Sequence, residues 1–166
     1  KLYASRPDVH CIKTLVQFEG PSCLDSIFAT TPLPLDFDLL VIDVDGCDYH
    51  VWDSLQRYNA RVIVIEFNPT IPNNVAFVQT RDMSVYQGSS LRALMELAQR
   101  KGYDLVCTTI YNAFFVRREF YPLFHIADNA IDVMHDTPMP TEFFQLYDGT
   151  LMLTGCKKLL WHKVGF

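Results

Sequence analysis

The chain has 166 residues, a length that fits one domain with a sizeable hydrophobic core. Of these residues 49% are hydrophobic and 20% are charged, which argues against a disordered protein. The net charge of -5 argues against a protein that binds nucleic acid through a basic face, so we expect no nucleic-acid partner. No apolar run approaches the roughly 20 residues of a membrane helix, so we expect no membrane span.

The five cysteines are widely spaced, and no two of them form a CxxC pair. This pattern argues against a zinc ribbon and against a thioredoxin motif. Free cysteines predict a reducing intracellular compartment, either the cytosol or an organelle interior. Cys47 stands beside the start of a predicted helix, where a thiol is expected to be somewhat acidified. The chain begins with Lys1 rather than Met, so we expect a processed or excerpted polypeptide.

Strand and helix signals alternate through the first two-thirds of the chain. The segment Val9–Val16 is rich in β-formers and follows a turn signal, which predicts a strand. A short helix is predicted over Cys23–Phe28. Phe37–Asp43 is a nearly continuous apolar run, a pattern typical of a strand covered by helices on both faces of a parallel sheet.

The next elements repeat this alternation. Asp48–Leu55 predicts a helix, with Asp48 as its N-terminal cap. Arg61–Phe67 is a second apolar strand that ends in acidic and polar residues. Residues 68–88 hold two prolines and show no periodicity, so they are predicted to form a long loop of the kind that carries function.

The clearest helix signal comes after this loop. Ser89 and Ser90 provide caps for a helix over Leu91–Lys101, and Gly102 ends it. Two further strands are predicted over Tyr103–Thr108 and Ala113–Arg117.

The order of these elements predicts an α/β fold with a mostly parallel sheet. The last two strands are too close in sequence for a helix between them, so one of them should run antiparallel. We expect one domain over residues 1–120 and a C-terminal extension over 121–166 that packs on it. Within the extension, Leu151–Leu153 is either one more short strand or a buried segment.

Polar side chains follow two of the predicted strands. Asp43, Asp45 and Gly46 come after the first apolar strand, and Glu66 and Asn68 come after the second. Ligands of open α/β sheets bind beyond the carboxyl ends of the strands, so these groups are expected to meet in one crevice if the strands are neighbours.

Three roles are open for this polar group. Oxygen ligands from Asp45, Glu66 and Asn68 would suit a divalent cation such as Mg²⁺, Ca²⁺ or Mn²⁺. The same residues would also suit the orientation of a substrate hydroxyl, or general-base catalysis. The third role is structural, because an acid after a strand often caps the following helix.

The stretch from Phe37 to Trp52, FDLLVIDVDGCDYHVW, resembles the FkbM-like group of class I S-adenosylmethionine-dependent methyltransferases. The resemblance covers roughly residues 1–120. It continues through four further segments: Val62–Pro69, Gly88–Leu91, Lys101–Tyr103 and Asn112–Val116.

The resemblance implies a Rossmann-like sheet in the strand order 3-2-1-4-5-7-6, with Val9–Val16 as the third strand and Leu39–Asp43 as the fourth. The first two strands, with the glycine-rich cofactor loop, would precede Lys1, so the sheet is expected to be incomplete at its N-terminal side. The hydrophobic edge left by their absence needs a cover. The N-terminal half of the same protein, another protein chain or a rearranged sheet would each provide one.

The resemblance also implies an activity, namely methyl transfer from S-adenosylmethionine to an oxygen or nitrogen of a small molecule. Asp43 and Asp45 would be catalytic, and Asp43 and Gly46 would contact the cofactor. Because the cofactor loop is absent, we expect the chain to be inactive by itself. The alternative is a non-catalytic, methyltransferase-like structural subunit of a larger, for example organellar, assembly. A metal-binding module without transfer chemistry is the third hypothesis.

Overall fold

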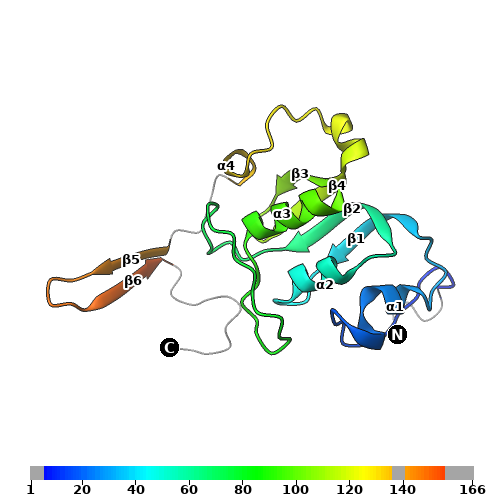
Figure 1. Cartoon of the computed structure of the whole chain (residues 1–166), viewed down its shortest axis with the longest axis horizontal. Coiled ribbons are helices and arrows are strands. Elements are labelled where there is room, and N and C mark those ends of the chain that lie inside the picture. Colours follow the sequence, from blue (N-terminus) through cyan, green and yellow to red (C-terminus); the bar gives the residue numbers. More distant parts are fainter. Residues whose placement is uncertain (1–5, 136–140, 156–166) are drawn as a thin grey trace.

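The structure of the chain, a computed structural model, describes residues 6–135 and 141–155. Its main body is a four-stranded sheet in the order β1-β2-β4-β3 (Figure 1). The strands are β1 (Asp36–Ile42), β2 (Asn59–Glu66), β3 (Tyr103–Thr108) and β4 (Asn112–Arg117). The helices are α1 (Leu24–Phe28), α2 (Asp48–Ser54), α3 (Leu91–Lys101) and α4 (Ile131–Met134), with 3-10 turns η1 (Gly20–Ser22) and η2 (Arg118–Phe124).

The sheet is mixed. β1 pairs with β2 in parallel, and β4 is antiparallel to both β2 and β3. Three strands therefore share one direction, while β4 lies reversed between two of them. This confirms the prediction that one of the last two strands runs antiparallel, but only one of the three strand pairs is parallel, so "mostly parallel" is wrong for the pairings. The short β3–β4 connection forces this reversal.

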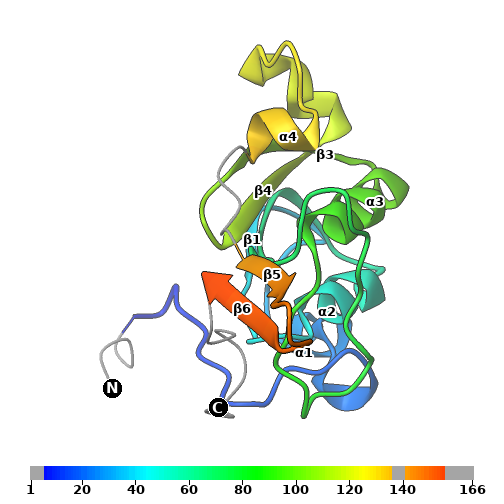
Figure 2. The same ribbon diagram turned by 90° about the vertical axis from the view of Figure 1, so that its left-hand side faces the viewer.

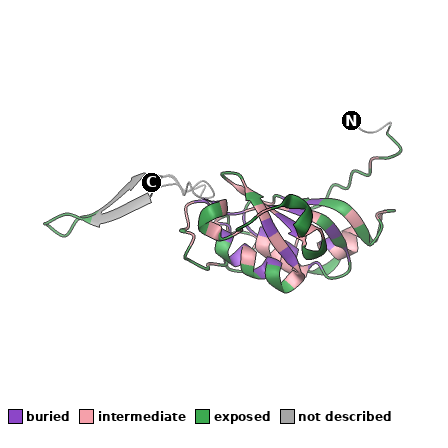
Figure 3. Ribbon diagram, turned by 90° about the horizontal axis from the view of Figure 1, so that it is seen from above, coloured by how far each residue is buried: buried purple, intermediate pink, exposed green. Residues whose placement is uncertain are grey.

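The core lies between one face of the sheet and the helices α2 and α3, which Figure 2 shows on the same side of the sheet. Trp52 of α2 packs against Phe115 of β4, with ring centroids 5.3 Å apart. Ile63 and Leu94 are fully buried, and each such side chain contributes about 1.5–3 kcal/mol of hydrophobic stabilisation. The buried residues gather in this layer (Figure 3).

The opposite face of β1 is exposed. Side chains alternate between the two faces of a strand, so Leu39 and Val41 lie on the face opposite to the buried Leu40. They keep 54% and 58% of their surface accessible. The apolar run in β1 led us to expect helices on both faces. In the described part of the chain, the β1 side chains are covered on one face only.

The helix α3 begins and ends at the predicted residues. The hydroxyl of Ser90 accepts hydrogen bonds from the amides of Ala93 (3.2 Å) and Phe77 (2.9 Å), so it caps the helix and also holds the preceding loop. Gly102 ends the helix in the left-handed conformation, at φ +81°.

The predicted strand over Val9–Val16 does not form. These residues pair with no strand, and Ile12 and Leu15 keep 46% and 68% of their surface accessible. A high β propensity reports how well a side chain fits a pleated, half-buried surface, and here no neighbouring strand provides that surface. The single bridge nearby joins Gln17 to Cys23.

The C-terminal extension has two parts. The turn η2 and helix α4 contact β3, and the Thr108 hydroxyl donates a hydrogen bond to the Met134 carbonyl at 2.6 Å. The strands β5 (Thr141–Gln145) and β6 (Leu151–Gly155) pair with each other as a separate two-stranded sheet, so Leu151–Leu153 lies in a strand. Residues 136–140 and 156–166 of the predicted extension lie outside the described residues. None of the helices in the described part has the length and apolarity required to cross a membrane.

The double role of Ser90 can be tested by substitution. We expect Ser90→Ala to lower the free energy of unfolding by about 2 kcal/mol, because it removes a helix cap and leaves a buried amide and a partly buried amide without this acceptor. Urea denaturation measures the change. Ser84→Ala, at an exposed serine of the same loop, is the control and should change stability by less than about 0.5 kcal/mol. Equal losses in the two variants would contradict the assignment.

Candidate functional site

Three carboxylates meet at the carboxyl ends of β1 and β2. Asp43 directly follows β1, Asp45 lies two residues further on, and Glu66 is the last residue of β2. Because β1 and β2 are parallel, with Ile42 opposite Ile65, both strands end at the same edge of the sheet. One oxygen of each carboxylate lies within 4.8 Å of the others, which is close enough for the three to bind one cation. We refer to these three residues as the acidic cluster.

The carboxylates of the acidic cluster lie close enough to repel one another. Asp43 and Asp45 are exposed, whereas Glu66 is partly buried. Burial, together with the negative charges of Asp48, Asp43 and Asp45, raises the pKa of Glu66 to about 8. Glu66 is therefore mostly protonated at neutral pH, and the cluster then carries less negative charge than its composition suggests. A bound cation would favour release of this proton.

Asp48 holds the turn that carries Asp43 and Asp45. We expected Asp48 to cap α2, but it is the first residue of that helix, and Cys47 occupies the cap position. The Asp48 carboxylate instead accepts hydrogen bonds from the amides of Val44 (3.0 Å) and Gly46 (2.9 Å). The cap prediction is wrong because the carboxylate of Asp48 binds amides of the turn that precedes α2 and not the first amides of the helix itself. Burial raises the pKa of Asp48, and these two hydrogen bonds oppose the rise.

Gly46 is required by packing. Its backbone has φ +140°, and a Cβ atom there would lie 2.8 Å from the carbonyl oxygen of Val85 and 3.0 Å from the Cα of Tyr86. Its amide is already bonded to Asp48. Asp45, immediately before it, also has positive φ, at +56°. The predicted cofactor contact of Gly46 stays a prediction, and the structure supplies a separate reason for glycine at this position.

Gln79 organises the long loop beside the acidic cluster. Its side chain is buried, and its Oε1 accepts hydrogen bonds from the amides of Gln87 (3.0 Å) and Gly88 (2.8 Å). Its Nε2 donates to the carbonyl of Val85 at 2.8 Å and to the sulfur of Cys47 at 3.2 Å. Sequence reasoning missed Gln79, because nothing in an aperiodic loop distinguishes a buried glutamine from the exposed polar residues around it.

Cys47 does not have the acidified thiol that we expected. Its side chain is buried, and this burial raises the pKa of the thiol. The sulfur donates a hydrogen bond to the carbonyl of Asp82 at 3.3 Å. Desolvation of a thiolate outweighs the hydrogen bonds from Gln79 and to Asp82, which act to lower the pKa. Cys47 therefore links α2 to the loop.

Asn68, predicted as a metal ligand, is held inside the loop. Its Oδ1 accepts hydrogen bonds from the amide (2.9 Å) and the hydroxyl (2.6 Å) of Thr70, and its Nδ2 donates to the carbonyl of Gln87 at 2.7 Å. The side chain is buried, and its polar atoms already have these partners. Ligation by Asn68 would require it to break these bonds, whereas Asp43 is available without any such change.

Gly46→Ala tests the packing role of the glycine. We expect a loss of about 2 kcal/mol or more in the free energy of unfolding, because the methyl group meets backbone atoms and the φ angle is strained. Gly20→Ala is the control, since Gly20 also has positive φ (+70°) but has no atom within 4 Å of the added carbon. Denaturant unfolding without any ligand measures both. A Gly46→Ala variant as stable as Gly20→Ala would show that packing does not require this glycine.

The raised pKa of Glu66 predicts how stability depends on pH. Between its ordinary value and about 8, the folded state keeps a proton that the unfolded state has released, so stability falls as pH rises through this window. Glu66→Gln removes this dependence, and at about pH 9 it should raise the free energy of unfolding by about 1 kcal/mol or more, a figure reduced from the full linkage value because the side chain is only partly buried. Denaturant unfolding at several pH values measures the slope. Glu96→Gln, on the exposed surface of α3, should keep the wild-type slope, and the same slope in Glu66→Gln would contradict the prediction.

Comparisons with known protein families, with curated proteins and with solved structures find no match to this chain. The likeness to the FkbM-like methyltransferases therefore depends on the sequence segments named above. What the structure adds is a mixed α/β sheet with an acidic cluster at the carboxyl ends of two parallel strands.

Proposed function

We propose that this chain is the C-terminal part of a methyltransferase-like domain of the S-adenosylmethionine-dependent type. In this proposal the sheet continues beyond β1 through another polypeptide segment, and methyl transfer to a small-molecule oxygen or nitrogen requires that segment. The chain by itself contributes the acidic cluster and the wall of the site around it.

The observation that carries the proposal is the strand order. The order β1-β2-β4-β3, with β4 reversed between β2 and β3, corresponds to strands 4-5-7-6 of the order that the resemblance implies. Because β1 corresponds to strand 4, the missing strands would continue the sheet at its free edge. A second support is that the acidic cluster lies at the carboxyl ends of β1 and β2, where ligands of open α/β sheets bind.

The cofactor would supply an activated methyl group, and the residues of this chain would handle the acceptor. The acceptor oxygen or nitrogen would receive this methyl group and would have to give up its proton. The acceptor proton passes to a carboxylate of the acidic cluster. Asp43 and Asp45 are exposed and suit this step, and Glu66 joins them once it has lost its proton.

The residues present fit the cofactor only in part. Asp43 and Asp45 offer exposed carboxylates beside the free edge of β1, whereas the amide of Gly46 is already bonded to Asp48. The remaining cofactor contacts would come from the segment that completes the sheet. The three carboxylates also fit a divalent cation, which would bind the acceptor or replace the proton held by Glu66.

A non-catalytic structural subunit is the alternative, and the exposed apolar side chains of β1 favour it, because they need a cover whether or not chemistry occurs. The two functions differ in one measurable property. Only the methyltransferase needs to bind S-adenosylmethionine once its sheet is complete.

Calorimetric titration of S-adenosylmethionine tests the proposal. We expect binding by the protein purified from its source with the polypeptide that completes the sheet, and none by the isolated chain. Asp43→Asn should weaken that binding by about tenfold or more, since it removes a charged hydrogen-bonding group. Asp38→Asn is the control, because Asp38 lies toward the other end of the same strand in a surface ion pair.

Two results would contradict the proposal. The first is the absence of S-adenosylmethionine binding by the complete assembly, which would favour the structural subunit. The second is equal binding by the Asp43→Asn and Asp38→Asn variants, which would remove the acidic cluster from the site.

A further inference from the structure

β1 is an edge strand with an unpaired side. It pairs with β2 on one side, and in the described part of the chain no strand pairs with the other side. Its backbone groups there form a row that a further strand could pair with. On the exposed face of β1, Leu39 and Val41 are 54% and 58% accessible. We refer to this unpaired backbone and these two side chains as the open edge.

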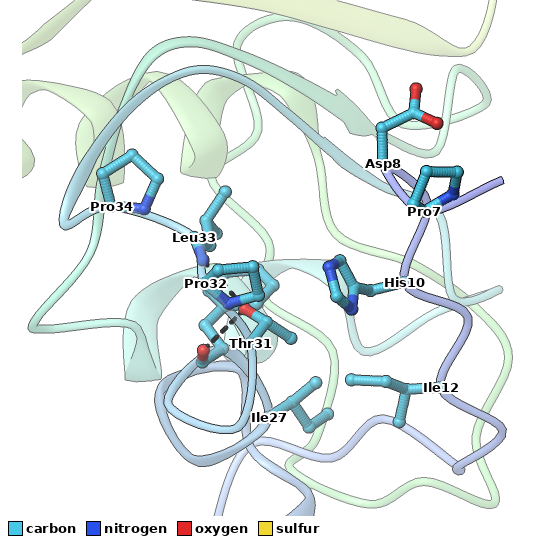
Figure 4. Close-up of a pocket in the computed structure, with 10 residues that line it drawn as sticks. Pro7, Asp8, His10, Ile12, Ile27, Thr31, Pro32, Leu33 and Pro34 are labelled. Carbon is cyan, nitrogen blue, oxygen red and sulfur yellow. Dashed lines mark hydrogen bonds between the residues drawn. The ribbon is translucent and has the colours of Figure 1, made fainter.

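A cleft lies next to the start of the open edge. It has a volume of about 650 Å³, and its two walls come from residues 7–12 and from residues 27–34, which end two residues before β1 begins. Figure 4 shows Ile12 and Ile27 facing each other across it, with His10 beside them. Most of the lining residues are apolar, and the volume lies in the range of ligand pockets in proteins.

The charges around the open edge indicate the sign of its partner. Asp36 and Asp38 have partners, because they form ion pairs with Arg117 and Arg61. Asp43 and Asp45, at the other end, are exposed and belong to none of the ion pairs of the described residues. The free charge beside the open edge is therefore negative.

These charges disfavour a second copy of the chain as the partner. Parallel pairing of β1 with another β1 would place the free Asp43 and Asp45 of two copies on strands about 4.8 Å apart, where like charges repel. Antiparallel pairing would place them near the Asp36–Asp38 end of the other copy, where both arginines are already in ion pairs. A segment with basic residues would instead be attracted to Asp43 and Asp45.

We propose that the open edge binds an extended, basic segment of a different polypeptide by strand addition. The backbone of this segment pairs with β1, and its apolar side chains cover Leu39 and Val41 and enter the cleft. A lysine or arginine lies beside Asp43 and Asp45. This inference rests on the proposed function for the incomplete sheet, and it adds the chemistry of the partner.

A peptide of alternating valine and threonine, with lysine at both ends, is the probe. We expect it to bind the chain and to slow hydrogen exchange at the backbone amides of β1. The same peptide with glutamate ends, and the same peptide with alternate amides N-methylated, should each bind at least about tenfold more weakly. The first comparison tests the charge, and the second tests the backbone pairing.

A pair of matched variants locates the binding. Val41→Lys should weaken binding of the lysine peptide by about tenfold, because it adds a positive charge and a polar side chain to the open edge. Val133→Lys makes the same change on α4 at a position of equal exposure, 58%, and should leave the binding unchanged. Neither substitution touches the core.

Several results would overturn the inference: no detectable peptide binding, equal binding of the lysine and glutamate peptides, equal binding of the N-methylated peptide, or equal effects of the two variants. Sedimentation showing a dimer that Val41→Lys dissociates would make a second copy the occupant instead. None of these measurements uses S-adenosylmethionine. Strand addition and methyl transfer can therefore fail independently of each other.

Discussion

The parallel pairing of β1 with β2 is the constraint on which the rest of the site depends. It aligns Ile42 with Ile65, and so it brings Asp43, Asp45 and Glu66 to one edge of the sheet. An antiparallel pairing of the same strands would have put these acids at opposite ends. Burial of Glu66, together with repulsion from the neighbouring acids, raises its pKa to about 8, and packing between the sheet and the helices α2 and α3 must stabilise the fold against this cost.

The acidic cluster is held from two sides. Asp48 binds the amides of the β1–α2 turn, and Gln79 binds the amides of the long loop and the sulfur of Cys47. Gly46 stands where the turn and the loop touch. Each of these buried polar groups has hydrogen-bond partners, so the turn is tied to both α2 and the long loop although Asp43 and Asp45 themselves are exposed. Such a support is what a binding site needs, and it is more than a surface turn requires.

The sequence predicted the local elements well and their partners less well. α3 could be located from an apolar stripe with a serine cap and a terminal glycine, because these signals are local. Val9–Val16 failed because a strand exists only with a neighbour, and that neighbour is not among the described residues. Asp48 was mistaken for a cap because residue type does not reveal which amides a carboxylate reaches. Gln79 was missed because its role depends on contacts with residues far away in the sequence, such as Cys47.

The open edge and the acidic cluster have opposite effects on self-association: the first favours pairing between copies of the chain, and the second opposes it. Exposed apolar side chains on an unpaired strand favour uncontrolled pairing with other copies. Asp43 and Asp45, which follow β1, would find no free basic partner at the edge of an identical chain, because Arg61 and Arg117 there already form ion pairs with Asp38 and Asp36. A basic segment would supply such a partner. The carboxylates proposed to act in chemistry thus also protect the edge beside them. A partner that neutralised them would complete the sheet and, in the same step, bring new groups next to Asp43 and Asp45.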